Sequence, residues 1–309
     1  MVNEICTKMC NPNKLVLILV LAAIARTTIS TDPSIVHGTA LIVGIAEEGV
    51  VIGQDHLRAA GSEIFKPIVQ KFSFCASDIV CGTSGLSQHN FSCLFKDSAG
   101  AQRGGQLEYN SYSWLAAIEK ESSVSGKTSP KSIADTIWKK ASSTFDPIEC
   151  FYFHTKEGQA QIDSDGPVMF VVAGYPSGSE SAEVYAVRVQ YDRQNSKLVY
   201  PAPEKIFPNG SEKLPVCFVA GDQERFDAIK EGREPFISIF RGFYSRRLTR
   251  TTLILKETPT ALQETLAWIA AFIDLESQFN PHVGGGSSIA VIRKGHSPSF
   301  VFMPQIAVR

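Results

Sequence analysis

The chain has 309 residues, which is enough for about two domains of ordinary size. Hydrophobic residues make up 44 % and charged residues 20 % of the sequence, a composition typical of globular proteins with ample material for a core. The 30 basic and 31 acidic residues give a net charge of −1, and no basic cluster stands out, so we do not expect nucleic acid as a partner.

Residues 1–25 have the pattern of a secretory signal peptide. Lys8 and Lys14 precede eleven consecutive apolar residues at positions 15–25. The last three of these, at 23–25, fit the small-x-small pattern that signal peptidase cleaves. The run is also shorter than the roughly 20 residues that a membrane-spanning helix needs. We therefore predict a secreted or periplasmic protein. The alternative is an uncleaved membrane anchor, the one case in which we expect a membrane partner.

Cysteines and histidines do not suggest a metal site. Seven cysteines occur, and two of them precede residue 25. The remaining five are an odd number, so in an oxidising compartment at least one thiol is free or intermolecular. Cys75 and Cys81 lack the spacing of metal ligands, and we predict that they are small core residues. The six histidines form no pair at helical spacing. We predict neither a metal nor a cofactor.

A β-hairpin is predicted soon after the N-terminal segment. The apolar residues 40–45 indicate a short buried strand, Glu47-Glu48-Gly49 a tight turn, and residues 50–55 the returning strand. Counted from Thr39 near the start of this hairpin, an aspartate, a lysine and a glycine follow after sixteen, thirty-two and forty-six residues. These three residues are Asp55, Lys71 and Gly85.

Together, these four residue types can form a hydrolytic site. A threonine hydroxyl is a weak nucleophile until a base lies beside it, and an α-amine with a pKa of about 8 can be that base. A lysine would raise the local positive potential, and a carboxylate would pair with the lysine. A glycine at a strand end would let its backbone N–H approach an oxyanion. Each residue also has an ordinary structural explanation, such as a turn aspartate or a solvated lysine, so the inference depends on their joint spacing.

In order and spacing, residues 37–85 resemble the start of a proteasome-type β subunit, a threonine peptidase of the N-terminal-nucleophile hydrolase superfamily. The resemblance needs no gap. It implies that Thr39 is the nucleophile and that Lys71 and Asp55 form the charged pair beside it. It also implies that Gly85 supplies the oxyanion donor.

The same resemblance implies a cleft for an extended peptide, which would be bound by strand addition. We therefore expect a peptide or protein substrate. The positions that match cleft residues of relatives are Arg58, Ala59 and Thr83.

Thr39 carries an α-amine only if the chain is cut before it. If signal peptidase cuts after Ala25, residues 26–38 remain as a propeptide, and relatives also carry a propeptide that ends in glycine. We predict self-cleavage between Gly38 and Thr39, which would leave residues 39–309 as the mature domain.

Predicted helices and strands alternate along the rest of the chain. Residues 122–130 are rich in serine and are predicted to be an exposed loop. One helix is predicted to begin within 86–96, ahead of a glycine-rich interruption at 99–105. Further helices are predicted to include residues 114–118, 132–138, 226–229 and 260–277. Strands are predicted at 168–175, 184–189 and 214–221. Residues 284–292 match the glycine loop and strand that follow the last helix in the family that residues 37–85 resemble.

The resemblance implies one α+β domain: a four-layer αββα sandwich, with two stacked antiparallel sheets flanked by helices, which is the N-terminal-nucleophile hydrolase fold. Relatives usually place an aspartate and a serine just before a glycine pair, where they help to orient the terminal amine. This chain has Asn280 and Val283 before Gly284. Asparagine can accept a hydrogen bond from an ammonium group but carries no charge, and valine can do neither. We keep Asn280 as an altered catalytic position.

Three functions are open at this point. The predicted one is a threonine endopeptidase that cleaves peptide or amide bonds through an acyl-enzyme on Thr39. The second is an inactive scaffold or assembly subunit, which Asn280 and Val283 would permit. The third is an amidase of the same superfamily with a non-peptide substrate, because a fold does not determine a substrate. A homo-oligomer or ring agrees with the resemblance, but family rings usually lie inside cells, so a signal peptide argues against a standard barrel.

Overall fold

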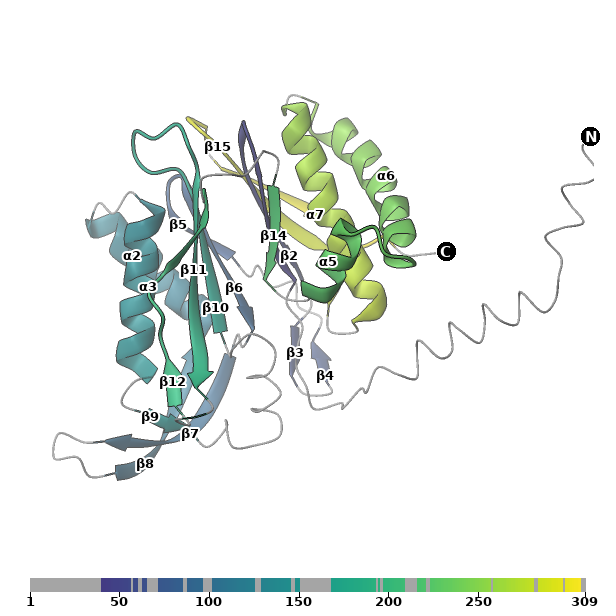
Figure 1. The fold of residues 1–309 in the computed structure, drawn as a ribbon. Coiled ribbons are helices and arrows are strands. Elements are labelled where there is room, and N and C mark those ends of the chain that lie inside the picture. The colour runs from purple at the N-terminus through teal and green to yellow at the C-terminus, as the bar shows by residue number, and fades with distance from the viewer. Residues whose placement is uncertain are drawn as a thin grey trace, which may run out of the picture. The chain divides into compact units, whose positions relative to one another are not determined.

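The computed structural model describes residues 40–306 with several internal gaps. Outside the described residues lie 1–39, 57, 61–62, 66–71, 86–87, 97–101, 126–128, 146–147, 151–167, 193, 195–196, 209–215, 221–222, 257, 281–282, 297 and 307–309. Contacts within the chain separate Met1–Ile35 from Val36–Arg309, and the elements described below belong to the second unit (Figure 1).

The first antiparallel sheet has five strands in the order β14-β1-β2-β15-β16. Strands β1 (Leu41–Ala46) and β2 (Gly49–Asp55) form the predicted hairpin, and Val43 lies opposite Ile52. Both strands are buried along their whole length, which explains the apolar runs that make up β1 and most of β2. The other strands are β14 (Val216–Ala220), β15 (Ser287–Arg293) and β16 (Ser299–Met303).

The second antiparallel sheet has the order β12-β11-β10-β6-β5, and β13 also pairs with β11. The strands predicted at 168–175 and 184–189 are confirmed as the neighbours β10 and β11. The bounds are β5 (Phe72–Ala76), β6 (Ile79–Gly85), β10 (Val168–Gly174), β11 (Glu183–Asp192), β12 (Lys197–Val199) and β13 (Glu204–Phe207).

The prediction of a helix that begins within 86–96 is wrong. This segment contains β7 (Gln88–Lys96), which pairs antiparallel with β8 (Gln102–Asn110). The sequence supports a strand, because Phe91, Cys93 and Phe95 recur at every second position. The remaining strands are β9 (Ile148–Cys150), which pairs with β7, and the pair β3 (Arg58–Ala60) and β4 (Glu63–Phe65).

Four of the five described helices match predictions, and one was missed. The helices are α2 (Ser111–Ser125), α3 (Pro130–Phe145), α5 (Gln223–Lys230), α6 (Phe236–Ile254) and α7 (Thr260–Phe279). The missed helix is α6. The predicted loop at 122–130 is shorter than expected, because α2 continues to Ser125. Asn110 starts α2 by accepting hydrogen bonds from the backbone N–H groups of Tyr112 and Ser113, at 3.0 and 3.1 Å.

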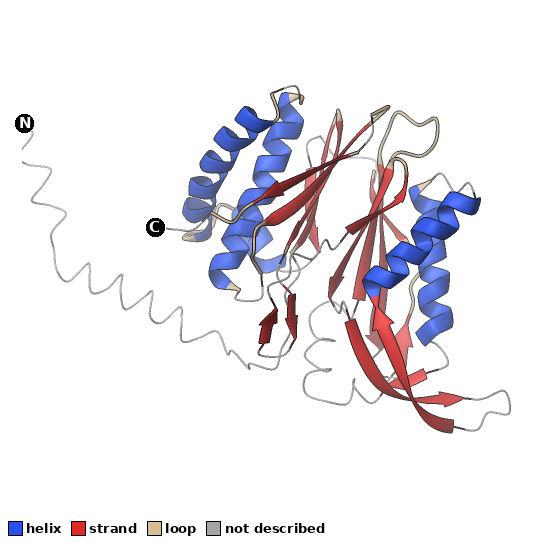
Figure 2. Ribbon diagram, turned by 180° about the vertical axis from the view of Figure 1, so that it is seen from behind, coloured by secondary structure: helices blue, strands red, loops and turns tan. Residues whose placement is uncertain are grey.

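Three apolar clusters relate the sheets to the helices (Figure 2). One cluster contains residues from the inner faces of both sheets, among them Ile52 of β2 and Val171 of β10. A second, with Ile137 of α3, packs α2 and α3 against the second sheet. A third, with Leu266 of α7 and Ile289 of β15, packs the C-terminal helices against the first sheet. The protein is therefore α+β with two antiparallel sheets, an arrangement compatible with the predicted sandwich.

Cys75 and Cys81 are buried, as predicted, but they are bonded to each other rather than separate. Their disulfide joins β5 to β6, with Cα atoms 5.9 Å apart and a sequence separation of 6. Both side chains are fully buried within the cluster under α2 and α3. The pair therefore covalently closes the β5–β6 hairpin.

A buried ion pair joins α6 to α7. Arg247 and Asp274 are each 1 % exposed, and the guanidinium donates to both carboxylate oxygens, at 2.6 and 2.7 Å. The same pair holds the C-terminal segment, because Arg247 donates to the Pro304 carbonyl at 3.0 Å and Asp274 accepts from Ile306 N at 3.2 Å. Burial raises the pKa of Asp274, and the Arg247 guanidinium opposes that rise. Within the described residues, no helix is long and apolar enough to cross a membrane.

Candidate active site

Asp55 is the best-defined residue of the candidate site. It ends β2, is fully buried, and accepts hydrogen bonds on both carboxylate oxygens. Ala40 N donates to Oδ1 at 3.2 Å and Gly284 N donates to Oδ2 at 3.4 Å. Ala40 N is the nitrogen of the peptide bond that follows Thr39. The carboxylate therefore lies beside Ala40, the first described residue and the one that follows the predicted nucleophile in the chain.

A glycine loop between α7 and β15 holds the other side of Asp55. Gly284, Gly285 and Gly286 have φ values of 151°, 73° and 94°, a region of backbone conformation that favours glycine. A Cβ atom on Gly286 would lie 2.6 Å from the Met303 carbonyl oxygen, which is too close for any other residue. The loop carbonyls of Gly284 and Gly286 accept from His56 N, at 2.9 and 3.2 Å. The loop is thus bonded to the two consecutive residues at the end of β2.

A hydrogen bond between the sheets brings the end of β2 to the end of β6. Gln54 Nε2 donates to the Thr83 carbonyl oxygen at 2.9 Å, and both residues are buried. Gln54 directly precedes Asp55, and Thr83 lies two residues before Gly85. Gly85 is exposed, ends β6 opposite Val168, and has a φ of 85°. Two of the predicted catalytic positions therefore lie at strand ends that this bond links.

The structure does not describe the predicted nucleophile or the predicted catalytic lysine. Thr39 and Lys71 lie outside the described residues, so their contact with Asp55 stays a prediction. Arg58 and Ala59 lie in β3, where they are paired with Phe65 and Ile64 of β4. Both β3 and β4 are edge strands of a two-stranded sheet, a geometry to which a peptide strand could add.

Asn280 and Val283 connect α7 to the glycine loop. Asn280 is the residue after α7, and its backbone N–H donates to the Glu276 carbonyl at 2.8 Å. The Asn280 carbonyl in turn accepts from Val283 N at 3.1 Å. Val283 is 4 % exposed and belongs to the apolar cluster around α7, which explains an apolar residue at this position. The role of the Asn280 side chain in orienting an amine stays a prediction.

Three polar residues around Asp55 were not predicted from the sequence. Gln54 supplies the bond between the sheets, and His56 Nε2 contacts Ser288 Oγ on β15 at hydrogen-bonding range. The His56 ring is 4 % exposed and its centroid lies 4.9 Å from that of Phe302. Gln54 interrupts an otherwise apolar strand, which was the available signal for a buried hydrogen bond. Its partner is a backbone carbonyl, and a carbonyl has no sequence signature.

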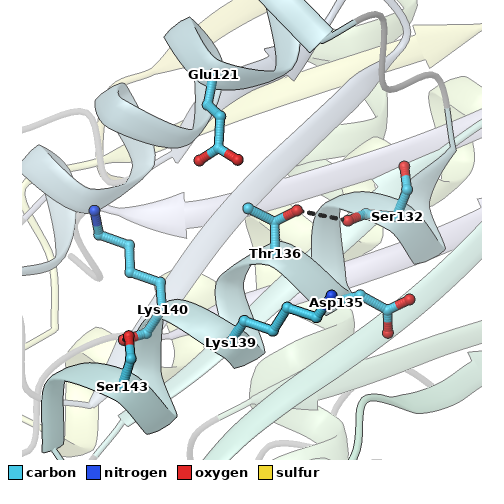
Figure 3. Close-up of a pocket in the computed structure, with 7 residues that line it drawn as sticks. All are labelled: Glu121, Ser132, Asp135, Thr136, Lys139, Lys140 and Ser143. Carbon is cyan, nitrogen blue, oxygen red and sulfur yellow. Dashed lines mark hydrogen bonds between the residues drawn. The ribbon is translucent and has the colours of Figure 1, made fainter.

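An open groove between α2 and α3 has a volume of about 690 Å³ (Figure 3). It is lined by Glu121, Ser132, Asp135, Thr136, Lys139, Lys140 and Ser143. Thr136 Oγ1 donates to the Ser132 carbonyl and Ser132 Oγ to the Ser129 carbonyl, each at 2.9 Å. Hydroxyls engaged with their own helix backbone are not activated by a base. The groove is therefore a solvated seam between two helices rather than a second candidate active site.

Within the described part of the chain, no group of three or more His, Cys, Asp or Glu side chains is arranged to hold a metal ion. Comparison with models of known protein families gives no match, and neither does comparison with curated proteins.

Proposed function

We propose that this chain is a threonine-type N-terminal-nucleophile hydrolase with a four-layer αββα fold, which cleaves peptide or amide bonds through an acyl-enzyme on Thr39. The observation that carries the proposal is the contact of Asp55 Oδ1 with Ala40 N at 3.2 Å. It is supported by the spacing of Thr39, Asp55, Lys71 and Gly85. Asp55 belongs to this four-residue pattern, and its carboxylate contacts the residue that follows Thr39 in the chain.

In the proposed reaction, Thr39 Oγ attacks the carbonyl carbon of the scissile bond while the α-amine of Thr39 accepts the hydroxyl proton. The oxyanion that forms is stabilised by the Gly85 backbone N–H. The tetrahedral intermediate collapses, the C–N bond breaks, and the α-ammonium returns its proton to the leaving amine. Water then hydrolyses the ester by the same route and restores the Thr39 hydroxyl. Lys71 favours proton loss at the site, and Asp55 holds Lys71 in place.

The same residues would release the amine. Thr39 Oγ attacks the Gly38 carbonyl, the Gly38–Thr39 amide becomes an ester, and hydrolysis of that ester leaves Thr39 as the new terminus. Gly38 has no side chain to hinder the attack. Asp55 contributes by holding Ala40 N, so that the start of β1 stays fixed while the bond before it is cut.

The proposed location is outside the cell or in the periplasm. The Cys75–Cys81 disulfide supports it, because stable disulfides are typical of oxidising compartments. The scaffold alternative also has one supporting observation. Val283, where relatives place a hydroxyl, is buried in the core and has no polar group to offer an amine.

The deciding experiment combines intact mass, N-terminal sequencing and labelling with a peptide electrophile. The wild-type chain from the exported fraction should begin at Thr39 and carry one label there, and Thr39→Ala should be uncut and unlabelled. Thr249→Ala is the matched control, because Thr249 is exposed on α6 and bonds only within its helix, to the Ser245 carbonyl.

A wild-type chain that begins near Arg26 and takes up no label would contradict the hydrolase and favour the scaffold. A chain that begins at Thr39 and is labelled by a small amide electrophile, but by no member of a library of peptide electrophiles, would favour the non-peptide amidase over the peptidase.

A further inference from the structure

The outer face of α6 carries a group of basic side chains. The helix packs against α7 and α5 and lies on the outer side of α7 (Figure 1). Among its 19 residues it has four arginines and no acidic residue. The prediction of no basic cluster is therefore wrong for this segment. We define the α6 patch as Arg246, Arg250, Leu253, Ile254 and Lys256.

The cations of the α6 patch have no acidic partner among the described residues. Arg246, Arg250 and Lys256 are exposed, and within the described residues none of them forms an ion pair. Arg250 acts on Asp274 only through its longer-range field, which helps to lower the pKa of that carboxyl. Several cations elsewhere on the described surface pair with acidic neighbours, as in the pairs Lys131–Asp135, Lys205–Glu183, Arg188–Glu204 and Arg233–Glu231.

Two aliphatic side chains lie among these cations. Leu253 and Ile254 are 64 % and 62 % exposed, more than any other large hydrophobic residue in the described part of the chain. They follow Arg250 by three and four residues, a spacing that places them beside it on a helix. Exposed aliphatic residues beside unpaired cations are typical of helices that lie in a lipid headgroup region.

We propose that the α6 patch docks on an anionic lipid bilayer. Arg246, Arg250 and Lys256 would contact the acidic headgroups, and Leu253 and Ile254 would enter the boundary between headgroups and acyl chains. This inference does not depend on the proposed peptidase activity.

The shape of the α6 patch favours a bilayer over a protein partner or a second copy of this chain. The side of a helix with protruding aliphatic residues is convex, and it suits a deformable plane better than a protein partner that needs a recess to anchor in. A second copy docked α6 to α6 about a two-fold axis would place arginines against arginines.

The test is co-sedimentation of the full chain with vesicles of phosphatidylcholine alone and of phosphatidylcholine mixed with phosphatidylglycerol. Arg246→Glu/Arg250→Glu should weaken binding to the anionic vesicles by about tenfold or more, because each basic residue near such a surface contributes about a fivefold factor. The matched control is Lys139→Glu/Lys140→Glu, which makes the same change in charge on the α3 groove. It should bind as the wild type does, and all variants carry the same N-terminal segment.

A second variant separates the contribution of the aliphatic side chains to vesicle binding from that of the basic side chains. Leu253→Ser/Ile254→Ser should weaken binding to anionic vesicles while leaving its salt dependence unchanged, because the arginines remain. Unchanged melting temperatures would show that each variant is folded.

Equal binding of the wild type to neutral and anionic vesicles would overturn the proposal. So would an arginine variant that loses no more affinity than the lysine control. Retention on immobilised polyglutamate that depends on the patch, without any vesicle binding, would overturn it in favour of an acidic protein partner.

Discussion

Replacing Asp55 by asparagine tests the candidate site at its best-described residue. The substitution keeps the shape of the side chain but leaves one acceptor oxygen where the carboxylate has two. Asp55 accepts from Ala40 N and from Gly284 N. In Asp55→Asn one of these N–H groups faces the new NH2 group and becomes a buried donor without an acceptor. Such a group costs about 1 to 3 kcal/mol, and the remaining bond loses its assistance from charge.

We therefore expect Asp55→Asn to lower the free energy of unfolding by about 2 to 4 kcal/mol. For a domain of this size, that corresponds to a fall in melting temperature of roughly 6 to 12 °C. The capture of Thr39 by an electrophile should slow by about 100-fold or more, because Lys71 would lose the carboxylate that we propose holds it. Thermal unfolding and the labelling rate of the remaining folded protein measure the two effects separately.

Asp192→Asn is the matched control for this experiment. Asp192 also ends a strand and accepts from a backbone N–H, that of Gln194 at 2.9 Å, but this bond is exposed to solvent. It should change the melting temperature by little and the labelling rate not at all. An unchanged melting temperature for Asp55→Asn would refute the described hydrogen bonds. A lower melting temperature with a normal labelling rate would show that Asp55 serves the fold and not the reaction.

Three further substitutions test other parts of the protein. Lys71→Ala should slow labelling of Thr39 by about 100-fold while the protein stays folded, and near-normal labelling would remove Lys71 from the site. Arg247→Leu should cost about 3 to 5 kcal/mol at neutral pH, because it leaves Asp274 buried without its cation. Without the guanidinium the pKa of Asp274 should rise further, so the folded variant binds a proton at this carboxyl more tightly than the unfolded chain does. The loss in free energy of unfolding should therefore shrink as the pH falls toward about 4. A loss that does not depend on pH would contradict this reasoning. Cys75→Ala/Cys81→Ala should lower the free energy of unfolding by about 2 kcal/mol, because the bridge closes only a short loop, and denaturant titration under non-reducing conditions measures the loss.

The hairpin of β1 and β2 and the helix α7 were predictable because each follows a simple local rule. The hairpin has two apolar runs around a tight turn, and α7 has an apolar stripe at helical spacing. The helix α6 was missed because Arg247 interrupts its apolar face. That arginine is buried only because Asp274, twenty-seven residues away, pairs with it. A long-range ion pair of this kind has no signature in the local sequence.

The candidate site also has a part that could be predicted from the sequence and a part that could not. The spacing of Asp55 from Thr39 predicted which carboxylate to examine, and the structure brings Asp55 to Ala40 N. The partners of Asp55 could not be predicted, since they are backbone N–H groups of Ala40 and Gly284, and any residue except proline offers such a group. The bond from Gln54 to the Thr83 carbonyl was hidden for the same reason.

The bond between Gln54 and Thr83 has a consequence for when a protease of this kind could become active. Asp55 and Gly85 end strands of different sheets, and the bond between Gln54 and Thr83 can form only when the apolar faces of those sheets are packed together. A chain still being exported, or one that has misfolded, would have its nucleophile but no complete catalytic centre around it. In the proposed hydrolase, folding itself would therefore control activation. An immature molecule could neither cut its own N-terminal segment nor attack neighbouring proteins, so no separate inhibitor would be needed during synthesis.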